Sequence, residues 1–346
     1  MGTFEIKELN FLNSNSSIFI CACEPSGDLY GSLFVKNYLY NRCKRIFGVG
    51  GEDLKNAGVS LIYDYHNLKT FGFTLGLSAI IKNIKMYRMI ARSLFQIKPD
   101  FFIPVAYPGI NLLLCRYAKR LKIKVIYLLP PQLWIWGSFR KYFIKKWVDI
   151  VVSVIPFEYH FYKQKKIRVT YWLNPLLKEL KKYQRDDYTK RIGFMPGSRT
   201  SEIKRNLPVI IELISHLQNK YNLEYSIILH PDTSNSKTLN KLRFLPNVKL
   251  IVRERYREMR NCDLIVTCSG TASLECSIME IPQIFFNRPG FLDYYVFRHL
   301  FNIDEYNLVN LYYRKKIVPV FVMRKKEKLR NLMLQELENL LRKMPD

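Results

Sequence analysis

The sequence predicts an α/β protein built from two nucleotide-binding-type domains. Apolar runs of strand length alternate with helical patterns along the chain, which is typical of parallel sheets with crossover helices. Two short polar segments, residues 23–28 and 196–199, each stand between an apolar run and a helical pattern. Such strand-to-helix junctions bind anions and nucleotides in α/β proteins. Because the two junctions are about one domain length apart, we expect two halves that face each other across a cleft.

The first half of the chain carries the pattern of one parallel sheet. Apolar runs predict strands at residues 18–22, 46–49, 101–106, 125–129 and 150–155. Between them, apolar residues recur at helical spacing over residues 30–41, 80–97 and 111–121. Residues 176–188 are dense in Lys, Glu and Asp and lack a buried-strand pattern, which indicates a connection between domains. We therefore expect an N-terminal domain at residues 1–175 and a C-terminal domain at residues 176–346.

The second half repeats this alternation. Strands are predicted at residues 192–195, 225–229, 248–252, 264–267 and 283–287, with helices near residues 202–219, 255–260 and 272–279. Residues 325–343 are basic, and apolar side chains recur at helical spacing from Leu329 to Leu340. This last pattern predicts a terminal amphipathic helix.

The composition describes a folded, strongly basic protein. Hydrophobic residues make up 48% of the 346 residues, and 55 Lys and Arg against 29 Asp and Glu give a net charge of +26. Such a charge attracts nucleic acid, acidic membranes or phosphorylated substrates. We find no RNP, zinc-finger or KH pattern, so no nucleic-acid partner is expected. The seven cysteines lie mostly in apolar runs without metal spacing, which favours a reducing compartment and no bound metal.

The sequence also indicates how the protein can contact a membrane. Residues 1–17 do not resemble a signal peptide, and no apolar stretch approaches the ~20 residues of a membrane span, so we expect a cytoplasmic protein with peripheral membrane contact at most. Residues 71–81 are apolar and are followed by Lys82, Lys85, Arg88 and Arg92. This segment fits either a surface that lies on an anionic leaflet or a buried loop and core helix.

Two polar loops in the C-terminal half carry groups that suit a diphosphate. The first offers backbone N–H groups at a helix start together with a guanidinium, and the second offers a further donor loop after a strand. Glu275 follows one helical turn after the second loop, where its carboxylate can accept the ribose hydroxyls of a nucleotide or be an ordinary surface glutamate. The loop residues are Gly197, Ser198 and Arg199, then Ser269, Gly270 and Thr271.

Together these segments resemble the lipid A disaccharide synthase family of inverting glycosyltransferases. That family has the GT-B fold, in which two Rossmann-like domains face a central cleft. The likeness extends from Cys23 to about Val322, and several short motifs follow in the family's order. They are Glu24-Pro25-Ser26-Gly27-Asp28, Gly48-Val49-Gly50-Gly51, Pro131-Gln132-Leu133-Trp134-Ile135-Trp136, Ile155-Pro156-Phe157-Glu158, Pro196-Gly197-Ser198-Arg199 with Glu202, Ser269-Gly270-Thr271-Ala272-Ser273-Leu274-Glu275, and Asn310.

The resemblance implies a reaction and its partners. It implies transfer from UDP-2,3-diacylglucosamine to 2,3-diacylglucosamine 1-phosphate, which forms the lipid A disaccharide and releases UDP without a cofactor or metal. It also implies contact with the inner-membrane surface and a possible homodimer. The residues expected to bind UDP are Gly197, Ser198, Arg199, Ser269, Gly270, Thr271, Glu275 and Asn310. Those expected on the acceptor and lipid side are Ser26, Trp134, Trp136, Phe71, Phe73, Leu75 and Leu77.

One departure from the family concerns the general base. The family has an aspartate in the segment Asp-Ala-Pro-Asp-Phe-Asn, whereas this chain has Ala106 and Gly109 at the two aspartate positions. Asp28 and Glu24 are the candidates to replace that base, and a capping role for Asp28 with local hydrogen bonding for Glu24 is the alternative. Two other functions therefore remain open: a catalytically impaired paralogue that binds a UDP-sugar or acidic lipid, and a transferase with a changed acceptor.

Overall fold

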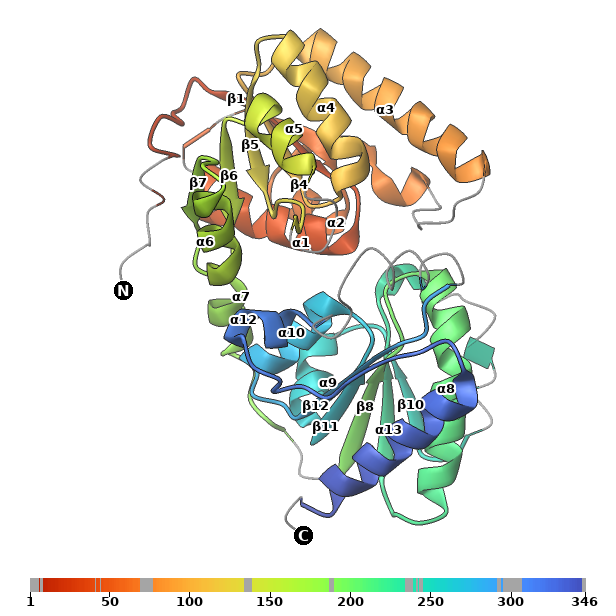
Figure 1. Ribbon diagram of the computed structural model, residues 1–346. Helices are drawn as coiled ribbons and strands as arrows, with labels where there is room; N and C mark the ends of the chain where they lie inside the picture. Colours follow the sequence, from red (N-terminus) through yellow and green to blue (C-terminus); the bar gives the residue numbers. More distant parts are fainter. Residues whose placement is uncertain are drawn as a thin grey trace. The chain divides into compact units, whose positions relative to one another are not determined.

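The chain folds into two compact α/β units (Figure 1). The computed structural model describes residues 6, 9–40, 42–43, 45–68, 77–133, 139–186, 190–233, 239–240, 242, 245–290, 294 and 307–343. Unit 1 is Met1–Pro175 and unit 2 is Leu176–Asp346, which coincides with the boundary that the sequence indicates.

Unit 1 contains a seven-stranded parallel sheet in the order β3-β2-β1-β4-β5-β6-β7. Its strands are β1 (Ser17–Ala22), β2 (Arg45–Gly50), β3 (Ser60–Asp64), β4 (Phe101–Val105), β5 (Lys124–Leu128), β6 (Ile150–Ser153) and β7 (Val169–Tyr171). Its helices are α1 (Pro25–Phe34), α2 (Glu52–Asn56), α3 (Leu77–Ile97), α4 (Pro108–Arg120), α5 (Arg140–Trp147) and α6 (Pro156–Gln164), with the shorter helical turns η2 (Val35–Leu39) and η3 (Tyr65–Leu68).

Both faces of this sheet are covered, which explains why its central strands are almost continuously apolar. Phe19 and Cys21 of β1 belong to a buried cluster that also contains Ile90 of α3, Leu114 of α4 and Ile144 of α5. Successive side chains of a strand point to opposite faces, so Ile20 points the other way and lies against α1 near Gly31. The sheet is therefore the middle layer between α1 and the α3, α4 and α5 group.

Unit 2 contains a six-stranded parallel sheet in the order β10-β9-β8-β11-β12-β13. Its strands are β8 (Arg191–Met195), β9 (Glu224–Ile228), β10 (Val248–Ile251), β11 (Leu264–Thr267), β12 (Gln283–Asn287) and β13 (Val320–Val322). Its helices are α7 (Leu176–Leu180), α8 (Thr200–Gln218), α9 (Arg255–Asn261), α10 (Gly270–Ile278), α12 (Leu308–Tyr313) and α13 (Lys326–Leu341), with the turn η4 (Pro231–Thr233).

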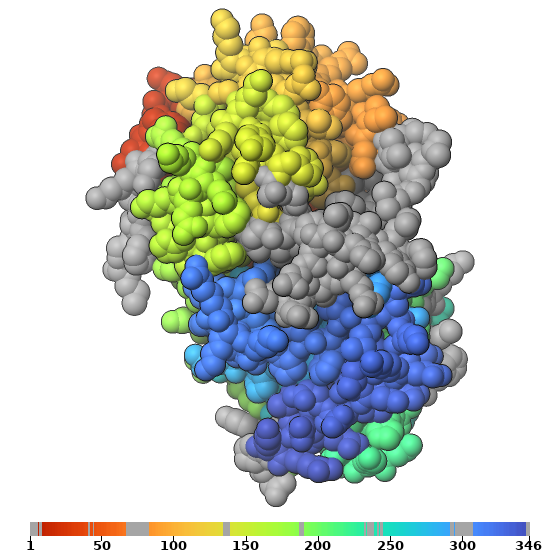
Figure 2. Space-filling view, in the orientation of Figure 1, coloured from red at the N-terminus to blue at the C-terminus, as the bar shows by residue number. Residues whose placement is uncertain are grey.

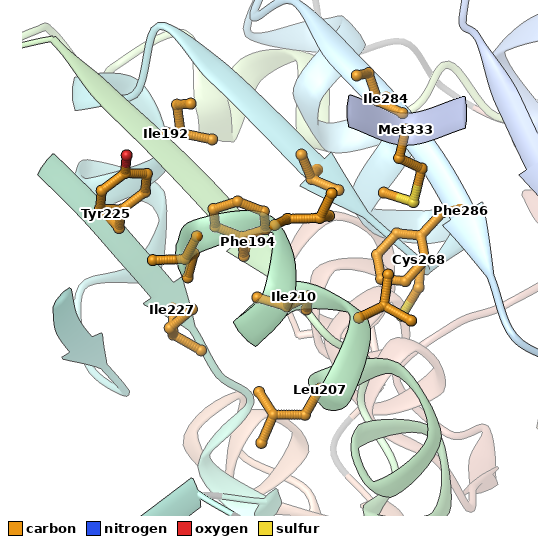
Figure 3. Close-up of a cluster of buried hydrophobic side chains, with 14 of the residues drawn as sticks. Ile192, Phe194, Leu207, Ile210, Tyr225, Ile227, Cys268, Ile284, Phe286 and Met333 are labelled. Carbon is orange, nitrogen blue, oxygen red and sulfur yellow. The ribbon is translucent and has the colours of Figure 1, made fainter. Parts of the chain in front are cut away.

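The main core of unit 2 lies between one face of its sheet and the helices α8 and α13. Figure 3 shows Phe194 of β8 beside Ile210 of α8, and Met333 of α13 close to Phe286 of β12. The terminal helix that the sequence predicts at residues 325–343 is thus α13, and its apolar stripe is buried in this core. Gly193 of β8 faces the opposite side, where it lies against Cys262 at the end of α9.

The structure confirms the predicted α/β fold with two parallel sheets, and it adds three of the four strands at the sheet edges. The sequence pattern does not reveal β3, β7 and β13, which are three of the four edge strands and lack a continuous buried run, whereas the fourth edge strand, β10, is predicted. The first helix also begins earlier than predicted, at Pro25, because proline is favoured in the first turn of a helix. None of the helices in the described part of the chain has the length and apolar content needed to cross a bilayer.

Candidate functional site

The two polar loops of unit 2 leave neighbouring strands at the same edge of the sheet. Met195, the last residue of β8, pairs with Thr267, the last residue of β11, and the N–H of Cys268 donates to the carbonyl oxygen of Met195 at 3.2 Å. The strand order reverses between these two strands, because β9 and β10 lie on one side and β12 and β13 on the other. In open α/β sheets, ligands bind at the carboxyl edge beside such a reversal.

The first loop already holds an anionic group. Glu202, in the first turn of α8, accepts a hydrogen bond from the N–H of Ser198 at 3.0 Å and pairs with the Arg199 guanidinium at 3.0 Å. Gly197 has φ +129° and lies so close to Glu202 that a Cβ would meet its Oε2 at 2.6 Å, so only glycine fits there. The loop therefore presents an N–H group, a guanidinium and a helix N-terminus to one carboxylate, which is the donor set for a phosphate.

The second loop begins α10. Ser269 precedes the helix with an extended backbone, Gly270 is its first residue, and both are half-buried together with Thr271. The N–H groups of the first turn of a helix have no partner within the helix. A Cβ built on Gly197 of the first loop would lie 3.2 Å from the Cys268 sulfur, so the two loops are in direct contact. The structure thus places the two predicted loops at the same edge of the sheet, and the contact of their residues with UDP stays a prediction.

Glu275 lies one turn into α10 and is almost fully buried. Its Oε1 pairs with the Arg255 guanidinium and accepts a hydrogen bond from the Tyr256 hydroxyl at 3.1 Å. Its Oε2 is buried and has no hydrogen-bond partner. Burial raises the pKa of the Glu275 carboxyl, and the adjacent guanidinium opposes that shift. Glu275 is therefore not an ordinary surface glutamate, because a buried carboxylate oxygen without a partner is costly unless a donor completes it.

The sequence does not reveal the residues that fix these loops. Asn206 of α8 donates to the carbonyl oxygen of Pro196 at 3.0 Å and accepts from the N–H of Arg288 at 3.1 Å, which ties the loop after β8 to the loop after β12. The Arg205 guanidinium donates to the Arg288 carbonyl at 3.0 Å, and the Arg288 guanidinium donates to the Arg324 carbonyl at 3.1 Å. In the sequence, the only sign of these contacts is that Glu202 and Asn206 are four residues apart, which places them on the same side of α8.

Asn310, the eighth predicted UDP residue, has a structural task in this fold. Its side-chain oxygen accepts hydrogen bonds from the N–H groups of Ile317 and Val318, both at 2.8 Å, and its side-chain nitrogen donates to the Val318 carbonyl at 2.9 Å. Asn310 therefore holds the turn that precedes β13. Its contact with UDP stays a prediction.

Unit 1 has a matching edge. Ala22 at the end of β1 pairs with Val105 at the end of β4, and the strand order reverses between these two strands. Glu24 and Ser26 follow β1 at the start of α1, where the Ser26 hydroxyl donates to a Glu24 carboxylate oxygen at 3.2 Å. This contact is the local hydrogen bonding that the sequence offered as the alternative to a catalytic Glu24. Both side chains are half-buried at the edge.

Asp28 caps a helix, although not the helix that follows it in the sequence. It lies inside α1, and its carboxylate accepts the N–H groups of Gly51 at 2.7 Å, Asp53 at 3.1 Å and Leu54 at 3.3 Å, at the start of α2. Burial raises the pKa of Asp28 to about 6, against the effect of these donors. The carboxylate would have to give up helix contacts to take a proton from a substrate. The assignment of Asp28 as general base is therefore the weaker of its two interpretations.

The segment that replaces the family's aspartate keeps an unusual backbone. Ala106 and Tyr107 both have left-handed conformations, with φ of +49° and +42°. Non-glycine residues seldom adopt this region, and Asp and Asn tolerate it better than Ala or Tyr. Two hydrogen bonds to the Ala106 carbonyl hold the conformation: one from the Tyr127 hydroxyl at 2.8 Å and one from the Asn111 side chain at 2.9 Å. The backbone at residue 106 therefore suits an aspartate, although this chain has no carboxylate there.

Several predicted acceptor and lipid-side residues lie outside the described part of the chain. They are Phe71, Phe73, Leu75, Trp134 and Trp136, and for Leu77 the structure gives only the backbone at the start of α3. Among the described residues, no group of three or more His, Cys, Asp or Glu side chains could hold a metal ion. The expectation of a reaction without a metal remains a prediction.

Known structures share this fold at low sequence identity. The chain is similar to a UDP-GlcNAc 2-epimerase from Methanocaldococcus jannaschii, solved in complex with UDP-GlcNAc and UDP, with a TM-score of 0.61, 17% identity and 92% of each chain covered. It is also similar to a UDP-GlcNAc 2-epimerase from Neisseria meningitidis bound to UDP-GlcNAc, with a TM-score of 0.57 and 14% identity, over 93% of this chain and 99% of the other. These likenesses support the GT-B fold class.

Relatives with higher sequence identity to this chain carry the same enzyme name. A lipid-A-disaccharide synthase from Geobacter metallireducens is 30% identical over 89% of this chain and 84% of its own length. Lipid-A-disaccharide synthase 1 from Legionella pneumophila strain Paris is 32% identical over the same shares of the two chains. The family model described as lipid-A-disaccharide synthetase matches residues 18–344, which include both strand edges. The chain therefore belongs to the lipid-A-disaccharide synthetase family.

Proposed function

We propose that this protein is a glycosyltransferase that joins UDP-2,3-diacylglucosamine to 2,3-diacylglucosamine 1-phosphate, with release of UDP. The observation that carries this proposal is the contact between the two donor loops of unit 2 at the reversal of its strand order. The family to which the chain belongs is named for the same activity.

Unit 2 supplies the groups that a departing UDP needs. Arg199 and the N–H groups of Gly197, Ser198, Gly270 and Thr271 would stabilise the charge that develops on the diphosphate. In the structure, the Glu202 carboxylate accepts a hydrogen bond from the N–H of Ser198 and pairs with the guanidinium of Arg199. UDP would therefore have to displace Glu202 from these donors or share the Arg199 guanidinium with it, because each N–H group can donate to only a few acceptors.

Glu275 fits the ribose in this proposal. Its Oε1 is engaged by Arg255 and Tyr256, whereas its buried Oε2 lacks a donor. A ribose hydroxyl would supply that donor and remove the cost of the unpaired oxygen. The same arrangement would reject a ligand that lacks the hydroxyl.

The missing carboxylate at Ala106 supports a second candidate function. Attack by a sugar hydroxyl at an anomeric carbon needs removal of its proton, and a positioned base contributes roughly 10²- to 10⁴-fold to the rate. Ala106 cannot accept a proton, and Asp28 is occupied by the start of α2. A paralogue that binds a UDP-sugar or acidic lipid with little turnover is therefore the alternative, and a transferase with a changed acceptor is another.

The proposed substrates also imply where in the cell the protein acts. Acylated sugars reside in a bilayer, so we propose peripheral association with the cytoplasmic face of the inner membrane, with a homodimer as a possible assembly. The net charge of +26 supports contact with phosphorylated substrates and anionic lipids. No cofactor is part of the proposal.

Mass spectrometry of the product tests the proposed reaction. The purified protein is incubated with both diacylglucosamine substrates, and Arg199→Ala serves as the variant that should lose activity. Formation of the disaccharide with UDP supports the transferase. Stabilisation by UDP without a product from this acceptor or from related lipid acceptors supports the binding paralogue, and a product only with another acceptor supports the changed specificity.

A further inference from the structure

Helix α5 of unit 1 presents a line of aromatic rings to solvent. Phe139, Phe143 and Trp147 stand four residues apart and so follow one side of the helix. The ring of Phe139 packs edge-on against Phe143 at 6.1 Å between centroids, and Phe143 stacks face to face on Trp147 at 4.7 Å. Phe139 and Tyr142 are 59% and 64% exposed, whereas Ile144 is buried and anchors the helix in the core. Figure 2 shows α5, in yellow-green, on the visible face.

Cations lie over these rings. The Arg140 guanidinium lies 5.9 Å from the centroid of Phe139, and the Lys141 ammonium lies 5.0 Å from that of Tyr142. From α4, which packs against α5, the Arg116 guanidinium lies 5.8 Å from the Trp147 ring. The α4–α5 surface therefore combines apolar rings with charged groups whose heads remain in water.

The charge of this surface has one sign. Helix α4 contains three basic residues and α5 contains four, and neither helix contains an acidic one. One of the seven, Lys119, is paired with Asp149 at 2.8 Å. On α4 the exposed Leu113 stands three residues before Arg116, so it adds an apolar group to the same side. A helix with aromatic and basic residues exposed together is typical of proteins that lie at a membrane interface.

We propose that the α4–α5 surface, formed by Leu113, Arg116, Phe139, Tyr142, Phe143 and Lys146, docks onto an anionic lipid bilayer. The aromatic rings would enter the headgroup region, while the lysines and arginines would contact lipid phosphates. This surface lies outside the apolar segment at residues 71–81 that the sequence singled out.

The arrangement of the rings favours a bilayer over a nucleic acid. Single-stranded nucleic acids bind by stacking their bases on free aromatic faces. Phe143 and Trp147 are parallel to within 3° and already stack on each other, which leaves no space for a base between them. The exposed Leu113 of α4 also offers nothing to a base but suits an acyl region.

A pair of matched variants tests the surface. Tyr142→Ser/Lys146→Ser removes one exposed tyrosine and one exposed lysine, four residues apart, from α5. Lys36→Ser/Tyr40→Ser removes the same two residue types at the same spacing elsewhere in unit 1, where Tyr40 is 66% exposed. Binding is measured by sedimentation with vesicles of phosphatidylglycerol and phosphatidylethanolamine, and with vesicles of phosphatidylcholine alone. A Phe139→Ser variant repeats the test at a third exposed position.

The expected result is binding to the anionic vesicles that falls roughly tenfold in Tyr142→Ser/Lys146→Ser and is unchanged in Lys36→Ser/Tyr40→Ser. Equal binding by both double variants, or binding of the wild type to single-stranded RNA but not to vesicles, would overturn the proposal. The proposal draws on the proposed function only through its bilayer substrates. Turnover with detergent-solubilised substrates is therefore measured in parallel, since absence of turnover in the wild type contradicts the function and not the surface.

Discussion

Met195 and Thr267 pair at the ends of neighbouring parallel strands, so the loops that follow them start side by side. One loop carries Arg199 and the other begins α10 at Gly270, five residues before the buried Glu275. The strand order reverses at this pair, which is where α/β sheets bind nucleotides.

Replacing Arg199 with Ala should weaken UDP binding roughly 10- to 100-fold, because a hydrogen bond to a charged group contributes about 1.5–3 kcal/mol. Isothermal titration calorimetry with UDP measures the change. Arg257→Ala is the control, since it removes the same charge from an exposed position on α9. Equal UDP affinity in the Arg199 variant and the control would remove Arg199 from the site.

Ala106→Asp should raise turnover by about 10²- to 10⁴-fold if the chain lacks a positioned base. The left-handed backbone at Ala106 accepts Asp without added strain, so the fold should be preserved. Ala106→Gly relieves the same backbone strain without adding a carboxylate, and it should leave turnover unchanged. A rate in Ala106→Asp no higher than in Ala106→Gly would show that the base lies elsewhere.

Asp28→Ala should lower the free energy of unfolding by about 1–2 kcal/mol, because the N–H groups of Gly51, Asp53 and Leu54 lose their acceptor. Asp28→Asn keeps an acceptor oxygen, so its free energy of unfolding should fall much less. Urea denaturation measures both variants. If Asp28→Ala is as stable as the wild type while Asp28→Asn abolishes turnover, Asp28 acts in the chemistry and not as a cap.

Glu158 should make stability depend on pH. It accepts a hydrogen bond from the Ser153 hydroxyl at 2.6 Å, and burial raises its pKa from 4.5 to about 8. Between these two values the folded chain holds a proton that the unfolded chain has lost. The contribution of Glu158 to stability is therefore fully present below the lower value and falls as the pH rises through the window.

Glu158→Gln has no such proton to lose. Its stability relative to the wild type should grow with pH across this window, by up to about 1.4 kcal/mol per pH unit. Urea denaturation at about pH 5 and about pH 8 gives the comparison. A constant difference between the two proteins at both pH values would mean that Glu158 titrates normally in the folded state.

Much of the fold can be predicted from the sequence because the inner strands are buried on both faces. Runs such as Ile18 to Ala22 and Leu264 to Thr267 contain almost no polar residue, and they are found where the pattern places them. The edge strands β3, β7 and β13 have partly exposed side chains, and their patterns do not differ enough from loops to be recognised. The fourth edge strand, β10, is also partly exposed, but it lies in a mostly apolar run at residues 248–252 and is recognised.

The candidate site is predictable in its loops but not in its supporting contacts. Gly197 to Arg199 and Ser269 to Thr271 stand directly after recognisable strands, so their position at the sheet edge follows from the pattern. The pairing of Arg255 with Glu275 and the cap that Asp28 gives to α2 join residues about 20 positions apart or more. Such contacts depend on how α9 lies beside α10 and α1 beside α2, which no local periodicity specifies.

Hydrogen exchange with and without UDP tests the central claim most directly, because it locates the ligand on the backbone. We expect UDP to slow exchange of the amides at residues 197–199 and 270–271, where N–H groups would bind the diphosphate. Protection confined to other parts of the chain, with these two loops unchanged at saturating UDP, would contradict the assignment of the β8 and β11 edge as the nucleotide site.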